Sequence, residues 1–112
     1  MSKGTFLGEF EQVVLLAVQR LEGQGYGMSI RREIERRTER GVSIGAIYAT
    51  LERLEKKGYL TSWEGDSTPV RGGRSRRHFQ LRPEGGDALR RSRGMLDRMW
   101  DGVEIAGSSK VR

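Results

Sequence analysis

Two helical patterns separated by only a few residues constrain the fold of this sequence more than any other feature. In the first, Ile30, Ile34 and Thr38 recur every four residues among charged side chains, which predicts an amphipathic helix with a narrow buried stripe. Ser43, a favourable N-cap residue, then begins a second run of apolar residues at helical spacing. The turn between the two patterns is short and contains Gly41. Two helices joined by such a turn form a helix-turn-helix.

The sequence on either side of this motif predicts one further helix before it and a hairpin and a helix after it. Apolar residues at three- and four-residue steps indicate a first helix over about residues 8–21. Strand-like patterns at residues 59–63 and 75–81 flank a turn-rich loop, which predicts a two-stranded hairpin. Pro83 suits the first position of a last, long helix that we expect to reach about Val103.

The predicted fold class is therefore mainly α (α+β): a winged helix-turn-helix with a two-stranded wing and a long C-terminal helix. We expect residues 6–82 to form the winged domain, residues 83–105 the C-terminal helix and residues 106–112 a disordered tail. The last helix is longer than the small core needs. With 35% hydrophobic residues that core is modest, so a partner chain would help to stabilise it.

The positive charge of the chain is concentrated in one short segment. The net charge is +6, from 21 Lys and Arg and 15 Asp and Glu. Residues 67–82 carry five arginines and no acid, whereas the charges of residues 1–66 cancel. A charge that only kept the protein soluble would be spread over the surface, so this distribution favours an anionic partner for the predicted wing.

The composition argues against catalytic and metal chemistry. The chain has no cysteine, which excludes disulfides and thiolate sites, and its one histidine, His78, lies in the basic strand with no neighbouring carboxylate. The glycines of residues 23–27 lack the preceding strand and following lysine of a phosphate-binding loop, so we expect a turn there. The sequence shows no signal-peptide pattern and no apolar run of membrane-spanning length. We therefore expect a cytoplasmic protein that is not an enzyme and needs no cofactor or metal.

Two groups of residues are candidates for contact with DNA. The second helix of the motif, which begins after Ser43, can enter the major groove, which is about 12 Å wide. Small outward side chains would let its backbone approach the base edges. Arginines around two glycines suit contact with phosphates or with a narrow minor groove. On the helix we expect Gly45, Ala46, Ala49, Thr50 and Arg53 to face outward, with Ser43 at the amino end and Tyr48 at the border; in the wing the candidates are Arg71, Gly72, Gly73, Arg74, Arg76 and Arg77.

Three segments resemble transcriptional regulators of the PadR type: residues 7–17, residues 26–34 and residues 43–60, together with the Arg-Gly-Gly-Arg wing. The resemblance covers about residues 6–105 and places the chain among the short members, which have a single C-terminal helix. It implies a winged-helix DNA-binding domain with a C-terminal helix that dimerises, usually in a repressor. Tyr26, Ser43, Tyr48 and the wing match positions at which such proteins commonly touch DNA.

On this basis we expect a homodimer that reads a palindromic operator in double-stranded DNA, with half-sites about one helical turn apart. The residues expected to form the dimer contact are Leu89, Leu96, Met99, Trp100 and Val103. Some relatives bind small aromatic or drug-like effectors at the dimer interface, and Trp100 lies on the helix that would line such a site. Packing at the interface is the simpler role for this tryptophan.

Two alternatives to a DNA-binding regulator remain open from the sequence. A winged-helix module could use its basic hairpin to bind an acidic protein partner. An RNA-binding role would draw on the Arg-Gly-Gly segment, although one such repeat without interleaved aromatic residues is weak support for it.

Overall fold

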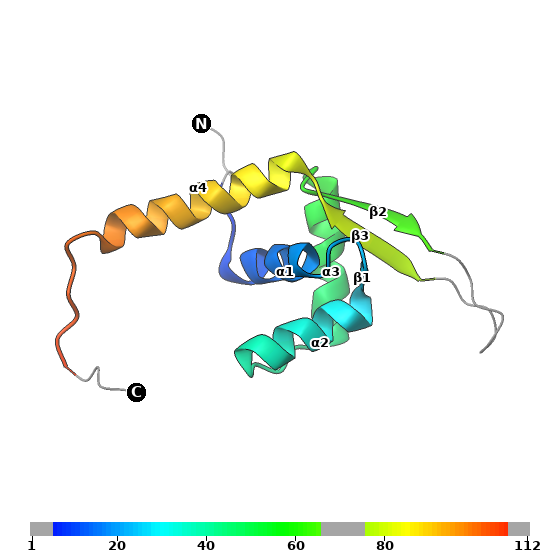
Figure 1. Cartoon of the computed structure of the whole chain (residues 1–112), viewed down its shortest axis with the longest axis horizontal. Coiled ribbons are helices and arrows are strands. Elements are labelled where there is room, and N and C mark those ends of the chain that lie inside the picture. The colour runs from blue at the N-terminus through cyan, green and yellow to red at the C-terminus, as the bar shows by residue number, and fades with distance from the viewer. Residues whose placement is uncertain (1–5, 66–75, 108–112) are drawn as a thin grey trace.

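The computed structural model describes residues 6–65 and 76–107. Figure 1 shows the helices of the first half of the chain packed together at the centre of the molecule, a small sheet beside them, and a long last helix that extends past them. The elements in chain order are α1 (Glu9–Arg20), β1 (Gly25–Tyr26), α2 (Gly27–Thr38), α3 (Ile44–Lys56), β2 (Leu60–Glu64), β3 (Arg77–Leu81) and α4 (Pro83–Trp100).

The ends of the helices follow local signals in the sequence. The Ser43 hydroxyl caps α3 by accepting a hydrogen bond from the Ala46 N–H at 3.1 Å. Pro83 stands at the start of α4, where its missing N–H costs nothing. This helix ends at Trp100, so the expectation that it continues to Val103 is wrong. The reason is the next turn, in which Asp101 leaves the helical region and Gly102 has a φ of 77°.

The sheet has three strands, one more than the predicted hairpin. Its order is β1-β3-β2 with both pairs antiparallel. The extra strand is only two residues long and stands in the segment expected to be a plain turn. Tyr26 of β1 and Trp63 of β2 both pair with His78 of β3, so the three side chains form one row across the sheet.

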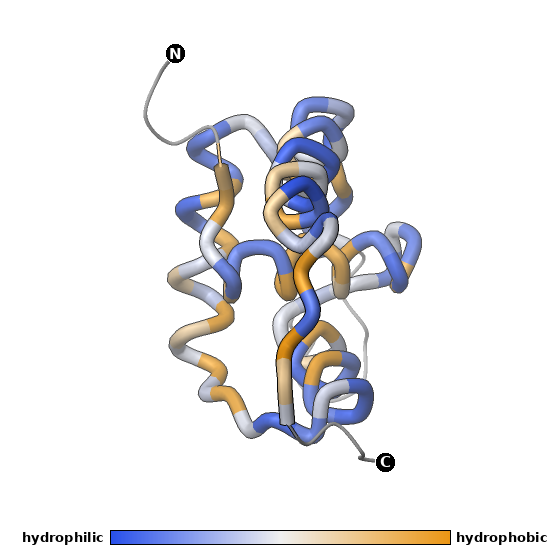
Figure 2. Tube along the Cα trace, turned by 90° about the vertical axis from the view of Figure 1, so that its left-hand side faces the viewer, coloured by the Kyte–Doolittle hydropathy of each residue, from blue (hydrophilic) through white to orange (hydrophobic). Residues whose placement is uncertain are grey.

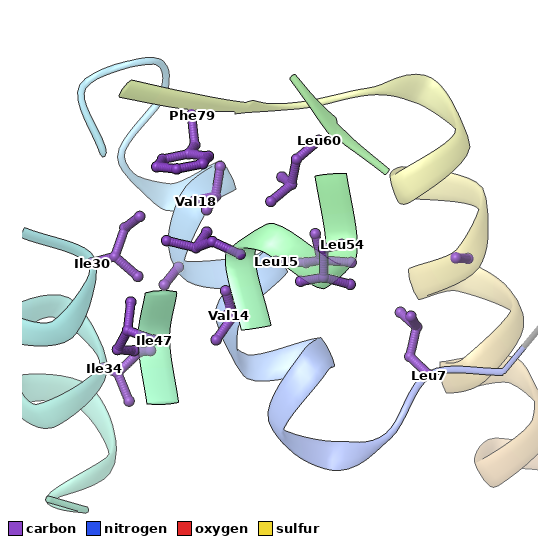
Figure 3. Packing of buried hydrophobic residues seen from close by; sticks show 13 residues of the cluster. Leu7, Val14, Leu15, Val18, Ile30, Ile34, Ile47, Leu54, Leu60 and Phe79 are labelled. Atoms are coloured by element: carbon purple, nitrogen blue, oxygen red, sulfur yellow. The ribbon is translucent and has the colours of Figure 1, made fainter. Parts of the chain in front are cut away.

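The core lies between α1, α2, α3 and one face of the sheet. Figure 3 shows side chains from all of these elements meeting in one cluster. Hydropathy alternates along the helices, as amphipathic packing requires (Figure 2). The labelled members are Leu7, Val14, Leu15, Val18, Ile30, Ile34, Ile47, Leu54, Leu60 and Phe79, and each is at most 6% exposed. Together, the helices and this sheet form a winged-helix fold of the α+β class.

The first half of helix α4 attaches it to this core. Ala88 and Ser92 are fully buried, and the Ser92 Oγ accepts a hydrogen bond from the Leu7 N–H at 2.9 Å. Because a buried serine in the middle of a helix needs such a partner, this bond ties the N-terminal segment to α4. The second half of α4 projects beyond the central helices (Figure 1). Among the residues described, no helix is both long and apolar enough to cross a membrane.

Candidate nucleic-acid interface

The orientation of α3 is set by the turn that precedes it. The Glu35 carboxylate of α2 accepts hydrogen bonds from the Val42 N–H at 3.1 Å and from the Arg31 Nε at 3.3 Å. The bond from Val42 is the main cause of a Glu35 pKa below the ordinary value of 4.5, and the Arg31 guanidinium lowers that pKa further. The Thr38 hydroxyl accepts from the Arg40 N–H at 3.2 Å. Both ends of the turn are therefore fixed to α2.

One side of α3 is exposed and carries small side chains, as a surface that approaches DNA closely would need. Gly45, Ala46 and Ala49 are exposed, and Ser43 is exposed at the amino end of the helix. Glu52 lies one turn further along, is also exposed, and was not singled out by the sequence pattern. A carboxylate at this position could accept a hydrogen bond from the amino group of cytosine.

Two residues expected on this outward side lie elsewhere. The expectation that Thr50 faces outward is wrong. Thr50 is only 3% exposed and belongs to the buried stripe of Ile47, Leu51 and Leu54. Its hydroxyl oxygen accepts from Arg53 Nη2 at 3.4 Å, so its polarity is satisfied inside the fold. The same arginine donates through its Nε to Glu11 of α1 at 3.3 Å. Arg53 is thus directed toward α1 and is not free on the exposed, small-residue side of α3.

The Glu11 carboxylate holds the amino end of α1 against the carboxyl end of α3. It accepts from the Gly8 N–H at 3.0 Å, the Lys57 Nζ at 3.0 Å and Arg53. Partial burial raises the pKa of Glu11, but the hydrogen bonds from Gly8, Lys57 and Arg53 outweigh it, so the pKa lies below 4.5. These contacts assign Arg53 and Lys57 a role in holding α3 in place.

Tyr48 lies where α3 meets the first turn of α2. Its side chain is 50% exposed, and its ring covers Gly27 so closely that a Cβ at residue 27 would collide with it. Tyr26, which precedes Gly27, is also the N-cap of α2 and a residue of β1. The contact therefore brings two of the predicted DNA-contact residues, Tyr26 and Tyr48, to one region of the surface.

The wing joins this region through aromatic contacts. The His78 ring stacks on Trp63 with 5.9 Å between ring centroids, and its other neighbour, Tyr26, meets it edge-on at 5.9 Å. The Arg76 guanidinium lies over the Tyr26 ring, with its Cζ 4.2 Å from the ring centroid. Tyr26, predicted from the resemblance alone, is thus in contact with the base of the wing.

The two described arginines of the wing face opposite sides of the sheet. Arg77 Nη1 donates to the Ser62 hydroxyl at 2.9 Å, and that hydroxyl donates to Glu55 of α3 at 2.7 Å. Arg77 also lies 3.8 Å from Glu64. Arg76 is thus the wing arginine on the side of Tyr26, while Arg77 serves contacts within the protein. Four further candidates, Arg71, Gly72, Gly73 and Arg74, lie outside the described residues.

Arg32 is a residue of this region that sequence reasoning missed. It is exposed on the first half of α2, and its Nη2 donates to the Tyr26 hydroxyl at 3.1 Å. The sequence pattern placed it among the ordinary surface charges of an amphipathic helix, and nothing in that pattern separates it from its neighbours. Only the contact with Tyr26 does so.

The predicted dimer residues fall into two groups. Leu96, Met99, Trp100 and Val103 are between 47% and 71% exposed. Leu89 is instead partly buried against the core cluster, so packing within the chain accounts for it. Leu16 of α1, 50% exposed, and Trp100 both line an open groove between α1 and α4, and neither is covered by described residues. No group of three or more potential metal ligands occurs in the described parts of the chain.

A comparison with known families identifies the chain. The model of the transcriptional regulator PadR-like family matches residues 14–91, which run from α1 into α4 and include the whole helix-turn-helix and the wing. The chain belongs to the PadR-like family. PadR-like proteins are transcriptional regulators and not enzymes, which confirms both the resemblance and the prediction that this chain is not an enzyme. None of the curated proteins compared with it matches.

Solved structures support the PadR-like fold. The chain in the complex structure of hsRosR-SG is 26% identical, with a TM-score of 0.67 over 87% of this chain and 79% of that one. A PadR family transcription regulator from Clostridium difficile is 21% identical, with a TM-score of 0.64 over 82% and 95% of the two chains. A PadR-like regulator from Bacillus cereus is 20% identical, with a TM-score of 0.61 over 82% and 87%.

Proposed function

We propose that this PadR-like protein is a homodimeric repressor that binds a palindromic operator in double-stranded DNA. The observation that carries the proposal is the exposed, small-residue side of α3 beside Tyr26, Tyr48 and Arg76, because it combines a surface for base edges with a cation for the backbone. In this proposal residues 6–82 bind DNA and residues 83–105 hold the two subunits together.

Dimerisation is supported by the second half of α4. Leu96, Met99 and Trp100 expose apolar surface that a monomer would leave in water. A second copy related by a two-fold axis would cover the same residues on both subunits. It would also place two α3 helices on one side of the dimer, which is the arrangement that a palindromic site requires.

A mobility-shift competition tests the DNA-binding part of this proposal. We expect the protein to retain a duplex containing the region upstream of its own coding sequence against excess unrelated duplex, single-stranded DNA and RNA. Retention by single strands alone would favour an RNA-binding role. No retention of any duplex at moderate salt would contradict the proposal and favour a module that binds an acidic protein.

The wing makes a separate prediction about salt. Replacement of a phosphate-contacting arginine by alanine should lower the slope of log affinity against log salt by about one unit. We expect this for Arg71→Ala, Arg74→Ala and Arg76→Ala. Arg77→Ala should change it less, because its guanidinium is held by Ser62 and Glu64. Unchanged slopes in all four variants would remove the wing from the interface.

We propose further that a small aromatic effector relieves repression by binding beside Trp100. The support is the groove between α1 and α4, which Leu16, Leu89, Leu96 and Trp100 line with apolar surface. Aromatic ligands should quench tryptophan fluorescence in the parent, and Trp100→Phe, which keeps Trp63 alone, should lose the response. An equal response in both proteins, or none across a panel of aromatic ligands, would contradict this proposal.

A further inference from the structure

Arg32 and Arg76 differ from neighbouring arginines in having no acidic partner in the part of the chain that the structure describes. On α2, Arg31 pairs with Glu35, and the next two arginines after Arg32, residues 36 and 37, pair with Glu33. Within residues 6–65 and 76–107 no carboxylate lies within ion-pair distance of Arg32 or of Arg76. Both side chains are exposed. Their positive charge is therefore uncompensated by any carboxylate among the described residues.

The guanidinium groups of Arg32 and Arg76 both contact the side chain of Tyr26. Arg32 reaches the hydroxyl of Tyr26 at 3.1 Å, and Arg76 lies over its ring at 4.2 Å from the centroid. Two like charges brought to the same side chain repel each other, and the repulsion is relieved when an anion binds both. A phosphate suits this pair because the planar guanidinium donates two parallel hydrogen bonds to phosphate oxygens.

The contacts below the phenol keep it in place. Tyr26 meets the edge of His78, which stacks on Trp63 across the next strand. A Cβ on Gly65, the residue after β2, would come within 2.7 Å of the His78 ring. The imidazole is therefore also packed against the backbone at Gly65. This row joins α2 to the base of the wing, and the two arginines contact Tyr26 from those two elements.

We propose that Arg32 and Arg76 bind one and the same phosphate of the DNA backbone across Tyr26, so that α2 and the wing hold a single group. The inference rests on the proposed function and extends it, because it adds Arg32 to the interface and makes the phosphate contacts of the helix-turn-helix and the wing interdependent. Tyr26 positions the two arginines, and its hydroxyl orients Arg32.

The test is a double-substitution cycle on a duplex of fixed, arbitrary sequence, because a phosphate contact needs no operator. Binding of the full chain to a labelled duplex of about 21 base pairs, two helical turns, is measured by fluorescence anisotropy over a range of salt. The variants are Arg32→Ala, Arg76→Ala and the double substitution. Arg98→Ala of α4 is the matched control, since it too removes an exposed arginine without an acidic partner among the described residues.

Each single substitution should weaken binding about tenfold, the usual worth of one charge-assisted hydrogen-bonded contact, while Arg98→Ala leaves it unchanged. Binding by the double variant should be weakened clearly less than about a hundredfold, which is the product of the two single losses. For the double variant, the slope of log affinity against log salt should also be no smaller in magnitude than for either single variant. A fully multiplicative loss, or no loss in either single variant, would overturn the shared site.

Tyr26→Phe separates positioning from folding. The substitution removes the hydroxyl that orients Arg32 and keeps the ring under Arg76, so it should act as a partial loss of Arg32. It should therefore reduce the effect of Arg32→Ala and, because the two arginines share one phosphate, also reduce that of Arg76→Ala. Full independence of Tyr26→Phe from Arg32→Ala would overturn the positioning role. A parent that binds duplexes without sequence preference would contradict the repressor proposal alone, and a parent that binds no duplex would overturn both.

Discussion

At the scale of single residues, Gly85 sets how closely α4 approaches the strand region. A Cβ at this position would collide with the Tyr59 carbonyl oxygen and come within 2.8 Å of Leu81 Cδ1, whereas a Cβ on Gly86 would meet Leu81 at an ordinary 3.8 Å. We predict that Gly85→Ala lowers the free energy of unfolding by about 1–3 kcal/mol, because backbone must move. Gly86→Ala, the matched control, should leave it unchanged or raise it by up to about 1 kcal/mol. Equal urea-unfolding midpoints for the two variants would contradict this contact.

The residue scale also shows where periodicity is a sufficient guide and where it is not. The apolar spacing after Ser43 indicates a helix with one buried side, but the polarity of Thr50 suggests an outward position, although Thr50 follows Ile47 by three residues and so shares its buried side. Arg53 and Arg77 look like free cations in the sequence. Their carboxylate partners, Glu11 for Arg53 and Glu64 for Arg77, lie 42 and 13 residues away along the chain, so only the folded structure brings them near.

At the scale of elements, the link between α2 and α3 depends on an ionised carboxylate. The pKa of Glu35 is lowered in the folded protein by the hydrogen bond from Val42, so this contact stabilises the fold above the ordinary value of 4.5 and is lost as the pH falls through the lower, folded value. Glu33, lowered chiefly by its hydrogen bond from Arg36, acts in the same direction.

We therefore predict that the melting temperature of the protein falls as the pH drops below about 4.5. Glu35→Gln should lower the melting temperature at neutral pH and make its fall in acid smaller. Glu52→Gln, at an exposed position of α3, serves as the control and should follow the parent. An identical acid profile for Glu35→Gln and the parent would show that the turn does not depend on this carboxylate.

Elements that depend on their own sequence were predictable, and those that depend on a distant neighbour were not. The three central helices and the hairpin carry periodicity and end signals such as Ser43 and Pro83. Strand β1 has only two residues, too few for any alternation, and exists because it pairs with β3. The Arg32–Tyr26–Arg76 arrangement likewise needs β1 and the wing in place, so no pattern within α2 could indicate it.

At the scale of the whole molecule, the exposed end of α4 predicts the oligomeric state. Met99 is 71% exposed and lies beside Leu96 and Trp100. In a two-fold dimer, residue 99 of both subunits would lie in the contact. Met99→Glu should therefore raise the dimer dissociation constant by at least about tenfold. Sedimentation velocity over a range of concentrations measures this, with Arg98→Lys as the control. A parent that sediments as a monomer at all concentrations would contradict the dimer.

The central claim is that two α3 helices of a dimer read DNA in a sequence-dependent way. Selection of bound duplexes from a random library tests it most directly, because one experiment reports specificity, symmetry and half-site spacing together. We predict the recovery of a palindrome whose half-sites lie about one helical turn, 10 to 10.5 base pairs, apart. Recovery of duplexes with no common sequence, or of a single unrepeated half-site, would contradict a dimeric, sequence-specific regulator.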